Sequence, residues 1–338
     1  MRQTVIAVTV LALLASFAKA QDWQPITTEL LQKEKPGYGG LSGVAVDRAT
    51  GNLFVDVSDR GVYRSNDQGK SWERLGKDQI KGRTETPGCL LLDPTGKTNR
   101  VVMATVYGGP IVVGNKDKGD WKTLDKATVH VDWFAVDWSD PDLKFVLALK
   151  HESGGLLLRS RDGGKSFDEL GKGHGPAWIF DADTAVVALM KSKDKPKGGL
   201  LRTADGGKTF QPVSEYTPTA LPRWHGDSLY WLADGALIKT ADRGATWTKL
   251  GDLKDGRFGP VFGKDAKQMF ALTGSGIVES ADAGATWSKP IAVPKELKGV
   301  SSLTWMDFDP IHDVLYVMKM TSELYKLARS GKPQTGLQ

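Results

Sequence analysis

Acidic and imidazole side chains that could carry out acid–base chemistry gather in the middle of the chain. Side chains in a strand alternate between its two faces, so His130 and Asp132, on either side of Val131, would share one face. His151 and Glu152 follow in a neighbouring predicted loop. Together these residues could form an acid–base site with a pair of carboxylates, the arrangement that glycosidases use. The catalytic candidates are therefore Asp132, Glu152 and His130, and the alternative is a solvated, hydrogen-bonded group without catalysis.

A second set of residues could bind a ligand. Arginine offers a planar pair of donors to carboxylates, and aromatic rings offer flat apolar surface. Residues of these types interrupt the repeated pattern of the chain at Arg83, Tyr107, His151, Trp178, Arg223 and Arg257. The spacing of the histidines matches no metal-binding motif. We therefore expect neither a metal ion nor a cofactor.

Aspartate also recurs in a repeated pattern, Ser/Thr-x-Asp-x-Gly-x-Ser/Thr-Trp/Phe, whose copies we call box turns. Five complete copies and one degenerate copy, which has lost a residue, contain Asp67, Asp117, Asp162, Asp205, Asp242 and Asp282. The carboxylate can accept nearby backbone N–H groups and the glycine can adopt a positive φ, so each copy predicts a structural hairpin turn. A calcium loop is the alternative, but each copy offers one carboxylate where Ca²⁺ needs several oxygens.

The box turns indicate which elements position the candidate residues. Consecutive box aspartates are 37 to 50 residues apart, and each interval holds short β-rich runs separated by turn signals. Four strands in such an interval make one blade of a β-propeller. An apolar run that ends in an aspartate-led turn, such as Val46-Asp47, occurs in seven places. We therefore predict an all-β, seven-bladed propeller of four-stranded antiparallel blades.

The two ends of the chain are predicted to meet. The seventh repeat supplies three strands, between residues 300 and 327, and has no box turn. Near the start, Trp23-Gln24-Pro25-Ile26 resembles Phe210-Gln211-Pro212-Val213, which reads as a fourth strand in mid-chain. We expect the N-terminal strand to complete the last blade and cover its open edge, so deletion of residues 21–28 should destabilise the ring.

With these motifs the chain resembles the Asp-box (BNR-repeat) β-propellers of the sialidase/sortilin-like superfamily. That group includes sialidases, sortilin-type receptors, some endoglucanases and a propeller that assists photosystem assembly. The resemblance covers nearly all of the chain after residue 20 and implies a fold rather than an activity. Sialidases combine an Arg-Ile-Pro motif with an arginine triad, a Tyr–Glu pair and an acidic proton donor. This chain has no Arg-Ile-Pro motif, so we do not assign it the sialidase active site.

The first 20 residues read as a secretory signal. Arg2 precedes the apolar run Val5–Phe17, and Ala18-Lys19-Ala20 fits a cleavage site. We expect cleavage after Ala20, a secreted or periplasmic location, a single propeller over residues 21–330 and a tail over 331–338. The lone Cys89 excludes an intramolecular disulfide.

Charge and composition narrow the partners. The formal net charge is +5, and the Lys and Arg residues are scattered rather than clustered, so no nucleic-acid module is visible. We expect a monomer without membrane insertion. The preferred function is a binding or interaction module for a protein or glycan. The ligand would bind at the channel face, where the loops between blades gather around the central channel. The alternative is a glycoside hydrolase, sialidase-like or polysaccharide-degrading, on the same face, and a third possibility is a scaffold that uses its blade edges.

Overall fold

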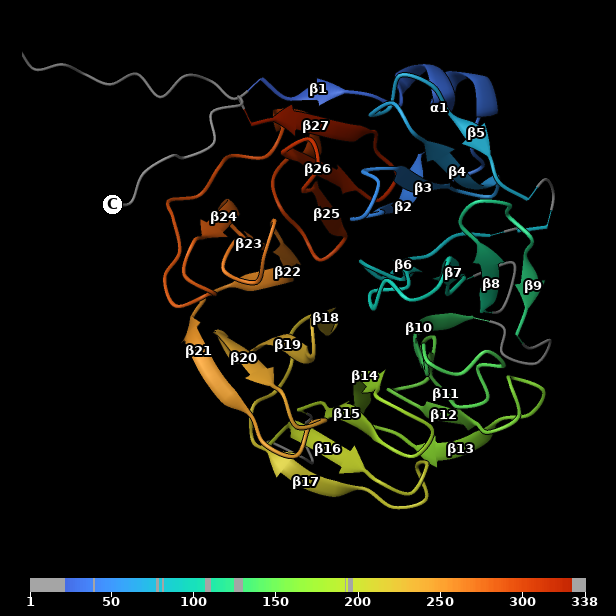
Figure 1. The fold of residues 1–338 in the computed structure, drawn as a ribbon, viewed down its shortest axis with the longest axis vertical. Helices are drawn as coiled ribbons and strands as arrows, with labels where there is room; N and C mark the ends of the chain where they lie inside the picture. The colour runs from blue at the N-terminus through green and yellow to red at the C-terminus, as the bar shows by residue number, and fades with distance from the viewer. Residues whose placement is uncertain are drawn as a thin grey trace, which may run out of the picture.

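The chain folds into a ring of β-sheets around a common centre (Figure 1). The computed structural model describes residues 22–38, 40–76, 79–80, 82–106, 111–124, 130–191, 193 and 197–329. Over these residues the strands form seven antiparallel sheets, as the repeat spacing predicted. The proposed signal segment 1–20 and the tail 331–338 lie outside the described residues.

The first four blades each have four strands in chain order from the centre outward. Blade one holds β2 (Leu41–Val46), β3 (Leu53–Val57), β4 (Gly61–Ser65) and β5 (Glu73–Arg74), and blade two holds β6 (Leu90–Leu92), β7 (Arg100–Met103), β8 (Val112–Asn115) and β9 (Lys122–Thr123). Blade three holds β10 (Val131–Val136), β11 (Val146–Lys150), β12 (Leu157–Ser160) and β13 (Asp168–Gly171), and blade four holds β14 (His174–Ile179), β15 (Ala185–Leu189), β16 (Gly199–Thr203) and β17 (Gln211–Ser214).

The remaining blades contain the irregular parts of the ring. Blade five holds β18 (Arg223–His225), β19 (Ser228–Ala233), β20 (Ala236–Thr240) and β21 (Thr248–Asp252). Blade six holds β22 (Gly256–Phe262), β23 (Met269–Thr273) and β24 (Gly276–Ser280), and the 3₁₀ helix η1 (Lys295–Leu297) follows it. Blade seven holds β25 (Thr304–Asp309), β26 (Val314–Lys319) and β27 (Leu324–Ala328) together with β1 (Gln24–Pro25).

The fourth position of blade six is shorter than predicted. Ile291 and Ile277 exchange two backbone hydrogen bonds, at 2.7 and 2.9 Å, and form an isolated bridge instead of a named strand. Pro290 precedes the bridge and has no backbone N–H to donate, which limits the ladder at this point.

The predicted closure of the ring is confirmed. Strand β1 pairs with β27, with Gln24 opposite Lys326. The Ile26 amide donates to the Leu324 carbonyl at 2.9 Å. Trp23 extends the closure to the neighbouring blade, because its indole Nε1 donates to the Ala292 carbonyl at 2.9 Å. Helix α1 (Thr28–Glu34) then leads from the closing strand into blade one.

The complete box turns share one hydrogen-bond pattern. In the first, Asp67 accepts the backbone N–H of Ser71 at 2.9 Å and its hydroxyl at 2.6 Å, and Ser65 Oγ donates to the same carboxylate. The equivalent bonds recur at Asp162, Asp205, Asp242 and Asp282. The hydroxyl of Ser166, followed by its backbone N–H, lowers the pKa of Asp162 to about 2.

The degenerate box turn is built differently from the prediction. Trp121 stands four residues after Asp117, where the complete copies have Ser or Thr, so this position has no hydroxyl to donate. Asn115 Oδ1 accepts the backbone N–H groups of the turn, and Asp117 Oδ2 instead accepts Asn99 Nδ2 at 2.7 Å.

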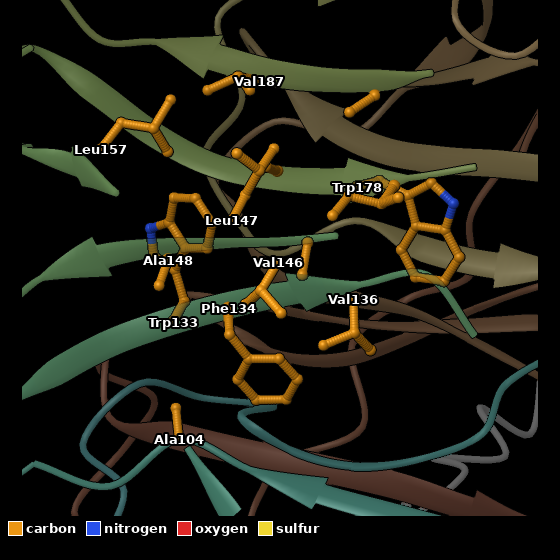
Figure 2. Packing of buried hydrophobic residues seen from close by; sticks show 14 of the residues in the cluster. Ala104, Trp133, Phe134, Val136, Val146, Leu147, Ala148, Leu157, Trp178 and Val187 are labelled. Atoms are coloured by element: carbon orange, nitrogen blue, oxygen red, sulfur yellow. The ribbon is translucent and has the colours of Figure 1, made fainter. Parts of the chain in front are cut away.

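The core lies between neighbouring blades. The inner strands are buried on both faces because each sheet packs between two others. In β10, Trp133 and Phe134 point to opposite faces and are only 2% and 5% exposed. Figure 2 shows Phe134 on the side of Ala104, which follows β7 of blade two. Burial of this kind, repeated around the ring, holds the inner strands and the side chains at their ends in place.

Candidate functional site

Two hollows lie along the axis of the ring, one at each face. Strands alternate in direction within a blade, so the turn after its first strand and its box turn lie at the same edge. Backbone bonds confirm this, for example from Gly163 of a box turn to Lys144 at 3.2 Å and from Gly206 to Asp183 at 2.9 Å. We call the hollow at this face the box-side cavity. The hollow among the loops that connect blades is the loop-side groove.

The box-side cavity has a volume of about 640 Å³ and is lined mainly by inner strands. Trp178 and Trp224 form one wall, with parallel rings whose centroids are 5.6 Å apart. His225 stacks on Phe262 at 4.4 Å nearer the turns. Burial is the largest cause that lowers the pKa of His225, and the charge of Arg48 acts in the same direction. The imidazole therefore contributes a neutral aromatic surface at neutral pH.

Arg223 is one of the cations that line the box-side cavity, together with Arg48, Lys116 and Lys264. Its guanidinium lies 4.5 Å from the centre of the Phe258 ring. Its Nε atom is buried, and no described residue accepts a hydrogen bond from it. Burial lowers the pKa of Arg223, and the carboxyl group of Asp307 opposes that change. Asp307 also lines the cavity, and burial raises its own pKa.

Arg48 lies in the same wall but is bound to the protein. Its Nη1 and Nη2 atoms donate to the carbonyls of Phe262 and Gly263 at 2.5 and 2.6 Å. These bonds join the first turn of blade one to blade six. Arg48 therefore stabilises the rim, whereas Arg223 retains unused donor capacity within the described structure.

The loop-side groove has a volume of about 740 Å³. Pro87, Pro176, Pro218 and Leu221 supply much of its wall, and Phe258 separates it from the box-side cavity. Its arginine, Arg257, is occupied by the protein: Nε donates to Asp255 Oδ1 at 3.1 Å and Nη1 to the Val300 carbonyl at 2.9 Å.

Two of the predicted acid–base residues, Asp132 and Glu152, lie beside His151 in a cluster outside both hollows. His151 Nδ1 lies 2.5 Å from Asp132 Oδ1, and His151 Nε2 lies 3.7 Å from Glu152 Oε1. The Asp132 carboxylate orients the imidazole, so the geometry is that of an oriented base rather than of two carboxylates facing each other across a cleft.

His130 does not share a strand face with Asp132 as predicted. Strand β10 begins at Val131 and has an irregular register between Val131 and Trp133. His130 itself has a φ of +66°, so the alternation of an extended strand does not reach it. Its backbone carbonyl accepts the His151 amide at 2.8 Å.

The ligand-binding candidates therefore lie in different places. Trp178 and Arg223 line the box-side cavity, and Arg257 lines the loop-side groove. Arg83 pairs with Glu85 at 2.7 Å and lies 3.7 Å above the Tyr38 ring, and it lines neither hollow. Tyr107 lies outside the described residues. Among the described residues, no three His, Cys, Asp or Glu side chains are arranged to hold a metal ion.

Several cavity residues were not singled out from the sequence. They are Arg48, Trp224, His225, Phe258, Phe262 and Asp307. One sequence signal was available for Asp307, which is a charged residue between two apolar residues, Met306 and Phe308, of an inner strand.

The chain is similar in structure to several solved β-propellers. The β-propeller domain of Cps50 (Swd1) from Myceliophteria thermophila has a TM-score of 0.60 and 11% identity, covering 86% of this chain and 98% of that one. YCF48 bound to D1 peptide has a TM-score of 0.52 and 14% identity, covering 93% and 97%. The extracellular domain of the putative one component system BT4673 from B. thetaiotaomicron has a TM-score of 0.56 and 11% identity over 90% of this chain.

These similarities show the seven-bladed fold and no more. This chain spans 40% of the BT4673 chain. No family model and no curated protein matches the chain. None of the helices in the described ranges is long and apolar enough to cross a lipid bilayer.

Proposed function

We propose that this chain is an interaction module that binds an apolar segment of a protein partner in the loop-side groove. The observation that carries the proposal is the chemistry of this hollow of about 740 Å³, which combines apolar walls with charges that are already paired. Arg257 is paired with Asp255, and beside the groove Lys191 Nζ pairs with Asp234 at 2.8 Å. A neutral rim gives a charged ligand no advantage, so an uncharged apolar segment matches it best.

Exposed apolar side chains also lie at this face of the ring, and one of them, Met190, lines the groove. Tyr38, Met190 and Leu303 are 49%, 36% and 39% exposed, and all three lie in loops at the same face as the groove. Apolar exposure next to a concave apolar surface is typical of protein–protein contact. A glycan fits less well, because prolines and aliphatic groups supply much of the groove wall and Phe258 is the one aromatic side chain among its described lining residues.

Two further points support the proposal. YCF48 is a propeller of similar fold, and its structure is described as bound to a D1 peptide. The sequence of residues 1–20 favours export, so we propose that the partner is met in the periplasm or outside the cell.

A random peptide library selected on the immobilised protein tests the proposal. We expect enrichment of uncharged, apolar-rich peptides. Met190→Asp should lower the affinity of the protein for the selected peptides about tenfold or more, because it places a charge at the apolar rim of the groove. Ile311→Asp is the matched control, since Ile311 is exposed at the opposite face and binding should be unchanged. Enrichment of charged peptides, or equal binding by Met190→Asp, would show that the groove is not the docking site.

A second candidate function is a hydrolase, possible because His151 is oriented by Asp132 at 2.5 Å. An imidazole held by a carboxylate is suited to act as a general base. A panel of glycosides that includes sialosides and β-glucans should then be turned over by the wild type and not by Asp132→Asn. Absence of turnover across the panel would remove this candidate.

A further inference from the structure

We propose that the box-side cavity is a second, independent binding site, for a carboxylate carried on an aromatic or aliphatic body. It lies at the opposite face from the loop-side groove and has a different chemistry. The two sites are close along the axis, since Phe258 lines both hollows, but Arg223 lines only the box-side cavity.

The environment of Arg223 is the first observation that supports the proposal. Arg223 is partly buried, its Nε has no acceptor among the described residues, and its guanidinium rests on the Phe258 ring at 4.5 Å. A buried donor without an acceptor is costly, and the planar guanidinium fits a carboxylate with two parallel hydrogen bonds. Stacking on Phe258 leaves the edge of the guanidinium, where its donors lie, as the binding surface.

The acidic residues of the cavity do not compete for that position, because backbone or side-chain donors of the protein already occupy them. Asp47 accepts Lys116 Nζ at 2.6 Å. Asp93 accepts the hydroxyls of Thr95 and Thr98 at 2.6 and 2.7 Å.

Asp307 is occupied in the same way. Its two oxygens accept the backbone N–H groups of Val46 and Phe308 at 2.7 and 2.8 Å. Its charge acts on Arg223 through space, without a direct hydrogen bond between the two in the described structure. Among the described lining residues, the buried side-chain polar atom without a hydrogen-bond partner therefore belongs to Arg223.

The walls define the rest of the ligand. Trp178 and Trp224 lie parallel on one side, the His225–Phe262 stack lies on another, and aliphatic residues of the inner strands fill the space between them. A volume of about 640 Å³ is in the range of small-molecule sites. These surfaces match an aromatic or branched apolar group next to the carboxylate. Either a free organic acid or the carboxylate of a polypeptide has this chemistry.

Calorimetric titration with paired ligands tests the proposal. The small-molecule arm uses phenylacetate and indole-3-acetate, each against its neutral amide. The peptide arm uses Ala-Ala-Phe with a free carboxylate, against the same peptide with an amidated end. In at least one arm, the acid should bind about tenfold or more tightly than the amide. The amide has no carboxylate and therefore loses the charge-assisted hydrogen bonds to Arg223. The arm that shows the difference identifies the source of the carboxylate.

Variants locate the site. Arg223→Met should abolish the preference for acid over amide, and Arg223→Lys should retain part of it. Arg243→Met is the control, since Arg243 is an exposed arginine on a box turn, paired with Asp181 outside the cavity. Equal binding of acid and amide in both arms, or no binding in either arm, would overturn the proposal even if Arg223→Met failed to fold. Unchanged binding by a folded Arg223→Met would overturn it as well.

Discussion

Replacement of Asp56 by Asn is predicted to stabilise the protein above pH 7. Asp56 lies on β3 with no exposed surface, and its Oδ2 is 2.5 Å from Ser42 Oγ. Burial raises the pKa of Asp56 from 3.8 to about 7. The Ser42 hydroxyl and the Thr84 amide oppose this change, and the charge of Asp59 adds to it. The carboxyl group is therefore easier to ionise in the unfolded chain than in the folded one.

The sign and size of the effect follow from the two pKa values. Between about pH 4 and pH 7 the folded state binds more protons than the unfolded state, so the free energy of unfolding falls as the pH rises. The difference between 3.8 and about 7 is about three pKa units, which corresponds to about 4 kcal/mol as an upper value. Below pH 4 the effect of the charge disappears, because Asp56 is protonated in both states.

Urea unfolding of the wild type and Asp56→Asn, at pH values from 4 to 8, measures this difference. The free energy of unfolding of the variant, relative to that of the wild type, should increase steadily from pH 4 to pH 7. Above pH 7 this difference should stay constant. Asp120→Asn is the control. Asp120 is exposed, so removal of its charge should leave the slope of the free energy of unfolding against pH as it is in the wild type. Parallel curves for the wild type and Asp56→Asn would show that Asp56 is not held as a buried acid.

Two further predictions concern the ring and its turns. Deletion of residues 21–28 should lower the free energy of unfolding by about 3 kcal/mol or more, because it removes the partly buried Trp23 and Ile26 and uncovers the edge of β27; an unchanged thermal midpoint would contradict the assigned closure. Asp162→Asn should make stability less sensitive to acid. With a folded-state pKa of about 2, Asp162 stabilises the protein above pH 4 and this contribution is lost as the pH falls towards 2. Thermal midpoints from pH 2 to 5 should therefore fall less in the variant, and equal falls would contradict the role of the box hydrogen bonds.

The sequence allowed the ring to be predicted because its signals are local and repeated. Each complete box turn satisfies its own hydrogen bonds within about eight residues, so its geometry depends little on distant contacts. The closing strand was predictable for the same reason, since Trp23–Ile26 has the residue types of a fourth strand elsewhere in the ring. The shortened edge of blade six was missed because the effect of Pro290 depends on which backbone groups face its neighbour.

The candidate sites were less predictable because they depend on where strands end and on which blades meet. The prediction extended the alternation of the strand to His130, but a left-handed φ at that residue ends it. Asp132 instead pairs with His151, in the turn after the next strand. The box-side cavity is assembled from residues far apart in the chain. Arg223 and Asp307 come from blades five and seven, and only the closed ring makes them neighbours.

The pairing of Gln24 with Lys326 sets an order on folding. The first strand of the described chain has no partner until β27 has been synthesised, so blade seven cannot be completed before synthesis reaches its last strand. From its synthesis until β1 pairs with it, the outer edge of β27 presents unpaired backbone groups that can pair with another chain. Contacts between such distant residues also form slowly, because a long loop must be closed first. For a chain that is exported as we propose, late closure would leave the ring open while the two ends of the polypeptide are on different sides of the membrane.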